Sequence, residues 1–247
     1  MRRVIILLSL LIATHASPAW SAFNIYDQNG YYWDIYDDTY GFVSNGTSDA
    51  YDNWLNLCVT TDLALTSECS TAERYNAGGV LGTNEAGGRQ IAMQPVTIGD
   101  LTVQRKVYVS DSGTYAYARF LEILTNPTAS AVTVKVRVGS VNWGDLGSDS
   151  GTVVTATSDG SGSLGPNLTW FATDDAGDGS GDPSLGHSIA GPTSLSPVTA
   201  MYQEPADVDS IYWEYIVTVP PGGQVTLMHF EIQAANRATA HSHAAEL

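Results

Sequence analysis

Residues 101–138 limit the possible folds more than any other stretch of the chain. From Leu101 to Val109, an apolar set of side chains, interrupted by Arg105, alternates with a polar set, the period-2 pattern of a strand with one buried face. A turn at residues 111–113 follows, and then an apolar run that ends before Pro127, because proline cannot donate to a ladder. Valines then alternate with polar residues up to position 138. We therefore predict three consecutive antiparallel strands.

Short runs of the same kind recur along the chain, separated by Gly, Pro, Asn and Asp. They lie at residues 31–36, 54–61, 89–93, 152–157, 169–173, 186–190 and 198–202, and residues 211–219 and 225–233 read as a final hairpin. Convincing helical periodicity is absent before the tail. This pattern predicts an all-β fold, an antiparallel two-layer β-sandwich over residues 22–235, with a twisted super-sandwich as the expected variety. The alanine-rich residues 236–247 predict a flexible or frayed-helical tail.

The first 21 residues predict a secretory signal peptide. Two arginines precede an apolar run at residues 4–13 that is too short to span a bilayer, which disfavours the alternative of a retained anchor. Cleavage after Ser21 places Ala19 three residues before the new terminus, whereas cleavage after Ala22 places the bulky Trp20 there. We expect a secreted or cell-surface protein, extracellular or periplasmic, without membrane insertion.

The charge balance is strongly acidic. The chain has 26 Asp and Glu against 10 Lys and Arg, a formal net charge of −16, and loss of the signal peptide removes two of the arginines. Nucleic acids and anionic membranes need a basic surface, so we exclude both as partners. Solubility outside the cell would by itself account for such a charge.

The two cysteines, Cys58 and Cys69, are eleven residues apart. Cysteines of a secreted chain are expected to pair, and this spacing suits the closure of a local loop. The alternatives, two free thiols or a metal site, have less support because no histidine lies nearby.

Aromatic residues are concentrated between positions 23 and 54. In residues 31–36, the alternation places Tyr32 and Tyr36 together on one face of a strand. This face is either an aromatic strip that stacks on sugar rings or the ordinary solvent side of a sheet. The two tyrosines are therefore candidate ligand-binding residues.

Four carboxylates lie within nine residues, separated by glycines. Asp174, Asp175, Asp178 and Asp182 are hard oxygen donors on a backbone that can curl around an ion, as Ca²⁺ requires. The spacing is not that of an EF-hand, since Ala176 stands at ligand position 3 and Leu185 at ligand position 12. The alternatives are a weak calcium site with Ca²⁺ as cofactor and an acidic surface loop.

No residue is assigned a catalytic role. GxSxG, HExxH, P-loop and paired CxxC motifs are absent, which removes support for the common motif-bearing hydrolases. His229 and Glu231 share a strand face and have the spacing of an acid/base or metal pair, although His229 also fits a packed strand residue. His241 and His243 form a weak metal signal in the tail.

Several segments, in this order, resemble a β-rich domain that recurs in large secreted bacterial multidomain proteins, often ahead of Ig-like or other adhesive modules. The matching segments are 49–52, 101–109, 119–128, 146–149, 173–175, 182–183 and 228–230. The resemblance implies an extracellular sandwich with no established activity and transfers no catalytic residue. This chain ends soon after its last strand, where relatives usually continue into further modules.

These observations lead to three functional hypotheses. The first is a non-catalytic secreted module for binding or assembly at the cell surface, with glycans or other surface proteins as partners. The second is a carbohydrate-active or carbohydrate-binding protein, which the tyrosine strip favours. The third is a self-assembling subunit of an extracellular fibre, built through edge strands.

Overall fold

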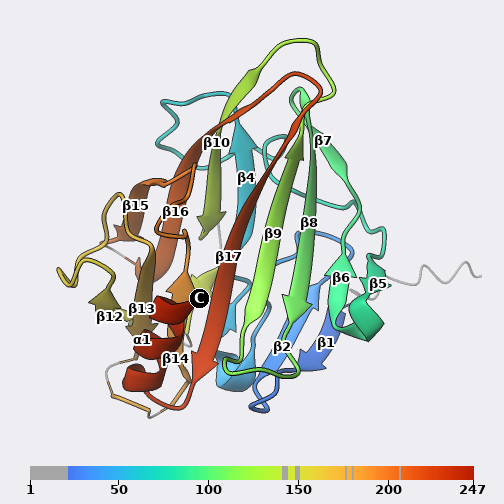
Figure 1. The fold of residues 1–247 in the computed structure, drawn as a ribbon. Helices are drawn as coiled ribbons and strands as arrows, with labels where there is room; N and C mark the ends of the chain where they lie inside the picture. The colour runs from blue at the N-terminus through green and yellow to red at the C-terminus, as the bar shows by residue number, and fades with distance from the viewer. Residues whose placement is uncertain (1–21, 141–143, 148–150, 176, 180, 206) are drawn as a thin grey trace, which may run out of the picture.

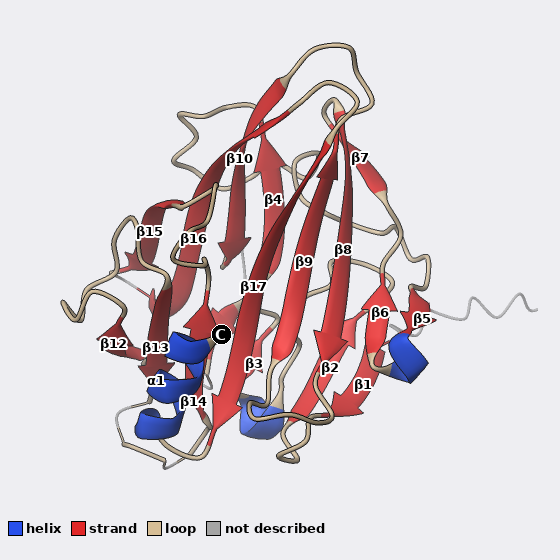
Figure 2. Ribbon diagram, viewed as in Figure 1, coloured by secondary structure: helices blue, strands red, loops and turns tan. Residues whose placement is uncertain are grey.

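The computed structural model describes residues 22–247 except 141–143, 148–150, 176, 180 and 206. The predicted signal peptide, residues 1–21, lies outside the described residues. The fold is all-β and antiparallel, as predicted, and two main sheets face each other as layers of a sandwich (Figures 1 and 2).

The larger sheet has nine strands. Its order is β12 (Val153–Thr157), β13 (Trp170–Asp174), β14 (Ser184–Ser188), β17 (Gln224–Ala234), β9 (Ala118–Thr125), β8 (Leu101–Val109), β6 (Gln90–Ala92) and β5 (Thr83–Glu85), with β7 (Val96–Ile98) also paired to β8. The smaller sheet has the order β15 (Val198–Glu204), β16 (Asp207–Val219), β10 (Val132–Gly139) and β4 (Asn56–Thr60).

Two short pairs complete the strands. They are β1 (Ala22–Tyr26) with β2 (Tyr32–Tyr36), and β3 (Tyr51–Asp52) with β11 (Asp145–Leu146). Single 3₁₀ turns lie at Thr47–Asp49 and Ala86–Gly88.

The core lies between the two main sheets. Along β8, buried and half-buried side chains alternate without interruption, and Arg105 is one of the buried ones. Aromatic rings join the layers: the Trp213 ring of β16 lies 5.5 Å from the His229 ring of β17 and 6.1 Å from the Phe171 ring of β13. The apolar alternation of the sequence therefore faces inward from both sheets.

Two connections cross between the sheets where the sequence predicts simple hairpins. Strand β10 pairs with β16 and β4, not with β9, and the predicted final hairpin is split because β16 and β17 belong to different sheets. The two connections are hydrogen-bonded to each other. The buried Asn126 side chain donates to the Val219 carbonyl at 3.0 Å, and the Asn126 backbone N–H donates to the Gly223 carbonyl. The predicted three-strand meander is wrong at its third strand.

The predicted flexible or frayed-helical tail forms a docked helix, α1 (Arg237–Glu246). Asn236 caps its first turn by accepting a hydrogen bond from the Thr239 N–H at 2.9 Å. Ala240 and Ala244 are buried, and a Cβ at Gly186 of β14 would lie 2.8 Å from the Ala240 carbonyl oxygen, so a glycine there allows the close approach. Within the described ranges, no helix is both long and apolar enough to cross a membrane.

The predicted disulfide is confirmed. Cys58 of β4 is bonded to Cys69, with the two Cα atoms 6.3 Å apart, and the bond closes the loop of residues 59–68. A disulfide fits an oxidising compartment, in agreement with the expected location outside the cytosol.

Candidate functional site

The inward face of the larger sheet carries a connected row of charged side chains. It starts at Arg105, whose Nε lies 3.0 Å from both carboxylate oxygens of Glu122. Glu122 Oε1 lies 3.1 Å from Nε2 of His229, and Nδ1 of His229 lies 3.4 Å from Glu231. All four side chains are fully buried.

The row continues across two further strands. Glu231 lies 2.6 Å from Nδ1 of His187 on β14, and Nε2 of His187 lies 3.0 Å from the Thr173 hydroxyl on β13. Each member sits on the inward phase of its strand, so the row follows directly from the period-2 pattern and the strand order.

In this row, burial and the neighbouring charged groups shift the pKa values in opposite directions. Burial acts to raise the pKa of Glu122, but the Arg105 charge and hydrogen bonds from His229 and Arg105 outweigh it and lower that pKa. Burial acts to lower the pKa of His229, but its hydrogen bonds to Glu122 and Glu231 raise it. The row can hold charge and protons, yet its side chains are inaccessible, so it is an internal ion network and His229 is a packed strand residue.

The candidate residues Tyr32 and Tyr36 lie on β2, half-buried. The Tyr32 ring packs 5.3 Å from the ring of Tyr26, which is 62% exposed. The Tyr36 ring meets Phe42 edge-on at 4.8 Å. Both rings are therefore partly occupied by neighbouring aromatics, and ligand binding by this pair stays a prediction.

Two of the four predicted calcium ligands contact helix α1. Asp174 accepts hydrogen bonds from Arg237 Nε at 2.7 Å and from the Ser184 hydroxyl at 3.0 Å. Asp178 accepts from the Arg237 backbone N–H at 2.8 Å. These carboxylates therefore fix the start of the helix, a role that the sequence pattern does not reveal. Calcium binding by this loop stays a prediction.

The Asp175 and Asp182 side chains lie near the backbone of Gly147. A Cβ placed on Gly147 would lie 3.4 Å from Asp175 Oδ1 and 3.9 Å from Asp182 Oδ2, so both carboxylates point toward this backbone. Within the part of the chain that the structure describes, no group of three or more His, Cys, Asp or Glu could hold a metal ion.

The two tail histidines do not converge. Nε2 of His241 lies 2.9 Å from the Thr155 hydroxyl, whereas the His243 ring packs edge-on against Tyr115 at 5.0 Å. Residues two apart on a helix do not face the same side, so the helix separates them. The HxH motif is therefore not a shared metal site.

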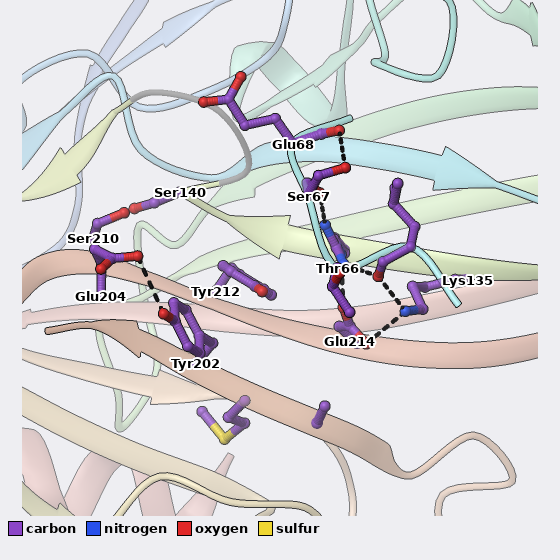
Figure 3. A pocket seen from close by; sticks show the side chains of 14 residues that line it. Thr66, Ser67, Glu68, Lys135, Ser140, Tyr202, Glu204, Ser210, Tyr212 and Glu214 are labelled. Atoms are coloured by element: carbon purple, nitrogen blue, oxygen red, sulfur yellow. Dashed lines mark hydrogen bonds and ion pairs between the residues drawn. The ribbon is translucent and has the colours of Figure 1, made fainter. Parts of the chain in front are cut away.

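An open groove lies on the outward face of the smaller sheet (Figure 3). Its volume is about 630 Å³, and its lining comes from β10, β15, β16 and the disulfide-closed loop. Tyr202 of β15 and Tyr212 of β16 are paired in register, with ring centroids 5.4 Å apart and planes inclined by 36°. Tyr202 is 42% exposed, so the pair offers ring surface to the groove.

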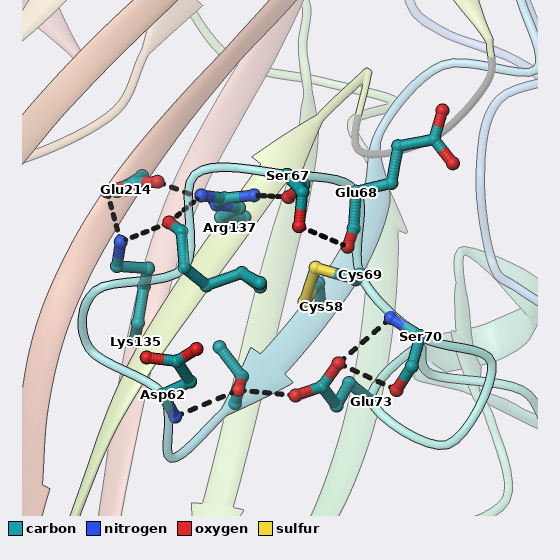
Figure 4. Close-up of a disulfide and its surroundings, with 12 residues drawn as sticks. Cys58, Asp62, Ser67, Glu68, Cys69, Ser70, Glu73, Lys135, Arg137 and Glu214 are labelled. Atoms are coloured by element: carbon teal, nitrogen blue, oxygen red, sulfur yellow. Dashed lines mark hydrogen bonds and ion pairs between the residues drawn. A yellow bond between two sulfur atoms is a disulfide. The ribbon is translucent and has the colours of Figure 1, made fainter.

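Two basic side chains beside the groove, Lys135 and Arg137, bind the disulfide-closed loop that forms one wall of the groove (Figure 4). Lys135 Nζ donates to the Leu65 carbonyl at 2.7 Å, and Arg137 Nη1 donates to the Ser67 carbonyl at 2.6 Å. Glu214 balances both charges, at 3.3 Å from Lys135 Nζ and 2.6 Å from Arg137 Nε. Together with the disulfide, these contacts fix the loop over the sheet.

Sequence reasoning missed this groove. Tyr202 and Tyr212 lie on the outward faces of their two strands, and the alternation in the sequence is enough to predict this orientation. Their pairing depends on the register of β15 with β16, which includes two irregularities. The loop residues that wall the groove carry no motif of their own.

Comparisons with known proteins show the fold and no more. No family model and no curated protein matches the sequence, so the resemblance to secreted bacterial modules stays a prediction. A solved structure of a putative aldose 1-epimerase from Escherichia coli K12 is similar with a TM-score of 0.50 and 7% identity, covering 86% of this chain and 98% of the other. A polysaccharide lyase aligns with a TM-score of 0.41 and 10% identity, over 86% of this chain and 30% of its own. The chain thus shares a β-sandwich fold with the epimerase-like structure.

Proposed function

We propose that this protein is a secreted carbohydrate-binding module that acts at the cell surface. The observation that carries the proposal is the Tyr202–Tyr212 pair, which offers ring surface to an open groove of about 630 Å³. Such a volume suits a ligand the size of a short oligosaccharide. Of the three functional hypotheses, the carbohydrate-binding one has the most support.

The chemistry of the groove suits sugars. The C–H face of a sugar ring is apolar and packs on an aromatic face, while sugar hydroxyls both donate and accept hydrogen bonds. Beside the tyrosines, the groove has the carboxylates of Glu68 and Glu204 and the hydroxyls of Thr66 and Ser210. A site of this composition gives stacking area together with several polar partners.

The structural neighbour gives secondary support. It carries the name of a putative aldose 1-epimerase, a protein that acts on a sugar, although at 7% identity it shows only the fold. The proposal is limited to binding, and the acid and histidine row of the larger sheet is given no part in it because its side chains are fully buried. Binding of a surface glycan also agrees with the hypothesis of a secreted non-catalytic module.

A glycan array followed by titration calorimetry tests the proposal. We expect binding of at least one oligosaccharide class by the native protein, and a loss of about tenfold or more in affinity for Tyr202→Ala with Tyr212→Ala, since stacked aromatics each contribute of the order of 1 kcal/mol. Tyr26→Ala is the matched control, because Tyr26 is an exposed tyrosine on a different strand pair.

A second arm separates the two aromatic sites. If Tyr32→Ala with Tyr36→Ala abolishes binding and the groove variant does not, the glycan site lies on β2 and the groove assignment is overturned. If no glycan binds the native protein, carbohydrate binding is excluded, and assembly of the native protein in electron micrographs would then favour the fibre hypothesis.

A further inference from the structure

We infer that the bound glycan is a long, uncharged polysaccharide chain that runs from the groove over the edge of β15 into a second groove. The inference rests on the proposed carbohydrate binding and deepens it, because it names the length and the charge of the ligand. It follows from the position of the second groove and from the charged groups around both.

The second groove, here called the edge groove, lies where the edges of the two main sheets meet. Strand β12 ends the larger sheet and β15 ends the smaller one, on the same side of the sandwich (Figure 1). The volume of the edge groove is about 520 Å³, and residues of both strands line it. Met201 and Tyr202 line the edge groove and the first groove alike. A ligand can therefore pass from one to the other over Tyr202, which is 42% exposed.

Hydrogen bonds fix the two sheet edges around the edge groove. The Gln203 side chain of β15 donates to the Val208 carbonyl at 2.7 Å and to the Thr152 carbonyl at 3.3 Å. The loop between β12 and β13 also lines the groove, and its Asn167 N–H donates to the Val198 carbonyl of β15 at 2.9 Å. The edge groove is therefore preformed, so a ligand does not bear the cost of ordering it.

The lining of the edge groove is uncharged. Among the described residues that line it, none is Asp, Glu, Lys, Arg or His. Val153 and Val208 are 40% and 39% exposed, and the polar part of the lining consists of hydroxyls and the Gln203 amide. Sugar hydroxyls can use such neutral partners, whereas a charged sugar would lose hydration here without gaining an opposite charge.

The charged side chains of the first groove already have partners within the protein. Glu214 lies 3.3 Å from Lys135 Nζ and 2.6 Å from Arg137 Nε. The Glu204 carboxylate accepts a hydrogen bond from the neighbouring tyrosine hydroxyl of β15 at 3.2 Å, and Glu68 also interacts within the protein. An acidic or a basic sugar would have to displace one of these contacts to find an opposite charge. A neutral chain has no such requirement in either groove.

The irregular strands at the edge favour a glycan over a peptide. An open sheet edge can also bind an extended peptide, because its unpaired N–H and C=O groups continue the ladder. The pairing of β15 with β16 has two register shifts, and that of β12 with β13 has one. Such bulges interrupt the regular spacing that an added strand needs. The hydroxyls of a sugar chain need no regular ladder.

A chain-length series tests the inference by titration calorimetry. The neutral probes are β-linked oligomers of glucose, of mannose and of xylose, each with about two units, which one groove can hold, and with about eight units, which extend into both. Long oligomers of galacturonic acid and of glucosamine, in mildly acidic buffer that protonates the amines, are the charged probes. For at least one neutral sugar, we expect the long chain to bind about tenfold or more tighter than the short chain and than both charged chains.

The variant Val153→Arg locates the effect in the edge groove. The longer side chain should obstruct this groove alone, so the affinity for the long neutral chain should fall about tenfold while that for the short chain stays unchanged. Unchanged binding of the short chain also shows that the variant is folded. A long chain gains affinity from its larger number of binding positions as well, and the variant keeps that gain. Met228→Arg is the matched control, because Met228 is 49% exposed on β17 and lines neither groove.

The outcomes distinguish the inference from the proposed function. Equal affinity for short and long chains, or an unchanged affinity of Val153→Arg for the long chain, overturns the role of the edge groove and leaves carbohydrate binding standing. Tighter binding of a charged chain overturns the uncharged ligand. Failure of all three neutral sugars overturns the inference, and the glycan array then decides whether carbohydrate binding stands. Binding of an uncharged threonine–valine peptide without binding of any oligosaccharide would assign the edge groove to a protein partner.

Discussion

At the scale of single residues, the buried pair of Arg105 and Glu122 has a large expected effect on stability. Both side chains are fully buried, and Arg105 also donates to the Gly41 carbonyl at 3.0 Å and the Leu55 carbonyl at 2.5 Å. Removal of one charge leaves the other without its main partner in the core, which costs about 3–5 kcal/mol. Arg105→Met should therefore lower the free energy of unfolding by this amount in urea titrations.

The double variant Arg105→Met with Glu122→Leu provides the matched comparison. It removes both charges of the pair, so it should lose less stability than Arg105→Met alone. A double variant that loses as much stability as Arg105→Met alone, or more, would contradict this account of the pair.

The same row predicts a dependence of stability on pH. The folded pKa of Glu122 is lowered from 4.5, so its contribution is present above pH 4.5 and is lost as pH falls through the folded value. The folded pKa of His229 is raised from 6.5, so its contribution is complete below pH 6.5 and is lost as pH rises through the folded value. Both contributions to stability are therefore complete only between the ordinary pKa of Glu122 and that of His229.

The variant His229→Gln tests the alkaline part of this dependence. It should flatten the fall in the free energy of unfolding above pH 6.5. His243→Gln is the control, because burial lowers the pKa of His243 and its effect on stability therefore falls at acid pH. An alkaline fall that is unchanged in His229→Gln would show that other groups cause it.

At the scale of elements, the disulfide-closed loop joins stability to the groove. Replacement of Cys58 and Cys69 by serine frees a closed loop of about 12 residues, which should lower the free energy of unfolding by roughly 3 kcal/mol. The loop forms one wall of the groove, so glycan affinity should fall as well. Denaturation and calorimetry of the same variant measure both, and unchanged binding would mean that Lys135 and Arg137 hold the loop without the disulfide.

Helix α1 and the acidic loop are linked through Arg237. If calcium binds the predicted carboxylates, it competes with Arg237 for Asp174, whose side chain is fully buried at this contact. Arg237→Ala should then enlarge the rise in melting temperature that Ca²⁺ produces relative to Mg²⁺. Asp178→Ala with Asp182→Ala is the matched control, and a Ca²⁺ shift that survives it would exclude this loop as the site.

The sequence predicts the elements better than their partners. The alternation in β8, β9 and β16 identifies strands and their buried faces, and two cysteines in a chain with a predicted signal peptide are enough to predict their bond. Period-2 alternation contains no information on which sheet a strand joins, so the crossings at Asn126 and Gly223 are not visible in it. The groove escapes prediction for the same reason, because it depends on register and on a loop folded over the sheet.

At the scale of the whole molecule, the acidic charge acts on partners more than on the fold. The formal net charge of −16 makes nucleic acids poor partners, because their phosphates require a basic surface. The fold is instead determined by the apolar alternation in both sheets and by the internal pairing of the few buried charges.

The position of β17 determines when the larger sheet can form during synthesis. This strand, Gln224–Ala234, is inserted between β14 and β9, so the larger sheet stays in two separate halves until this strand has left the ribosome. The two halves of this sheet can therefore join only after β17 has been synthesised. A chain stopped after residue 219 should be degraded by a protease at a concentration that leaves the full chain intact, whereas a resistant fragment of that length would show that the first half of the sheet folds alone.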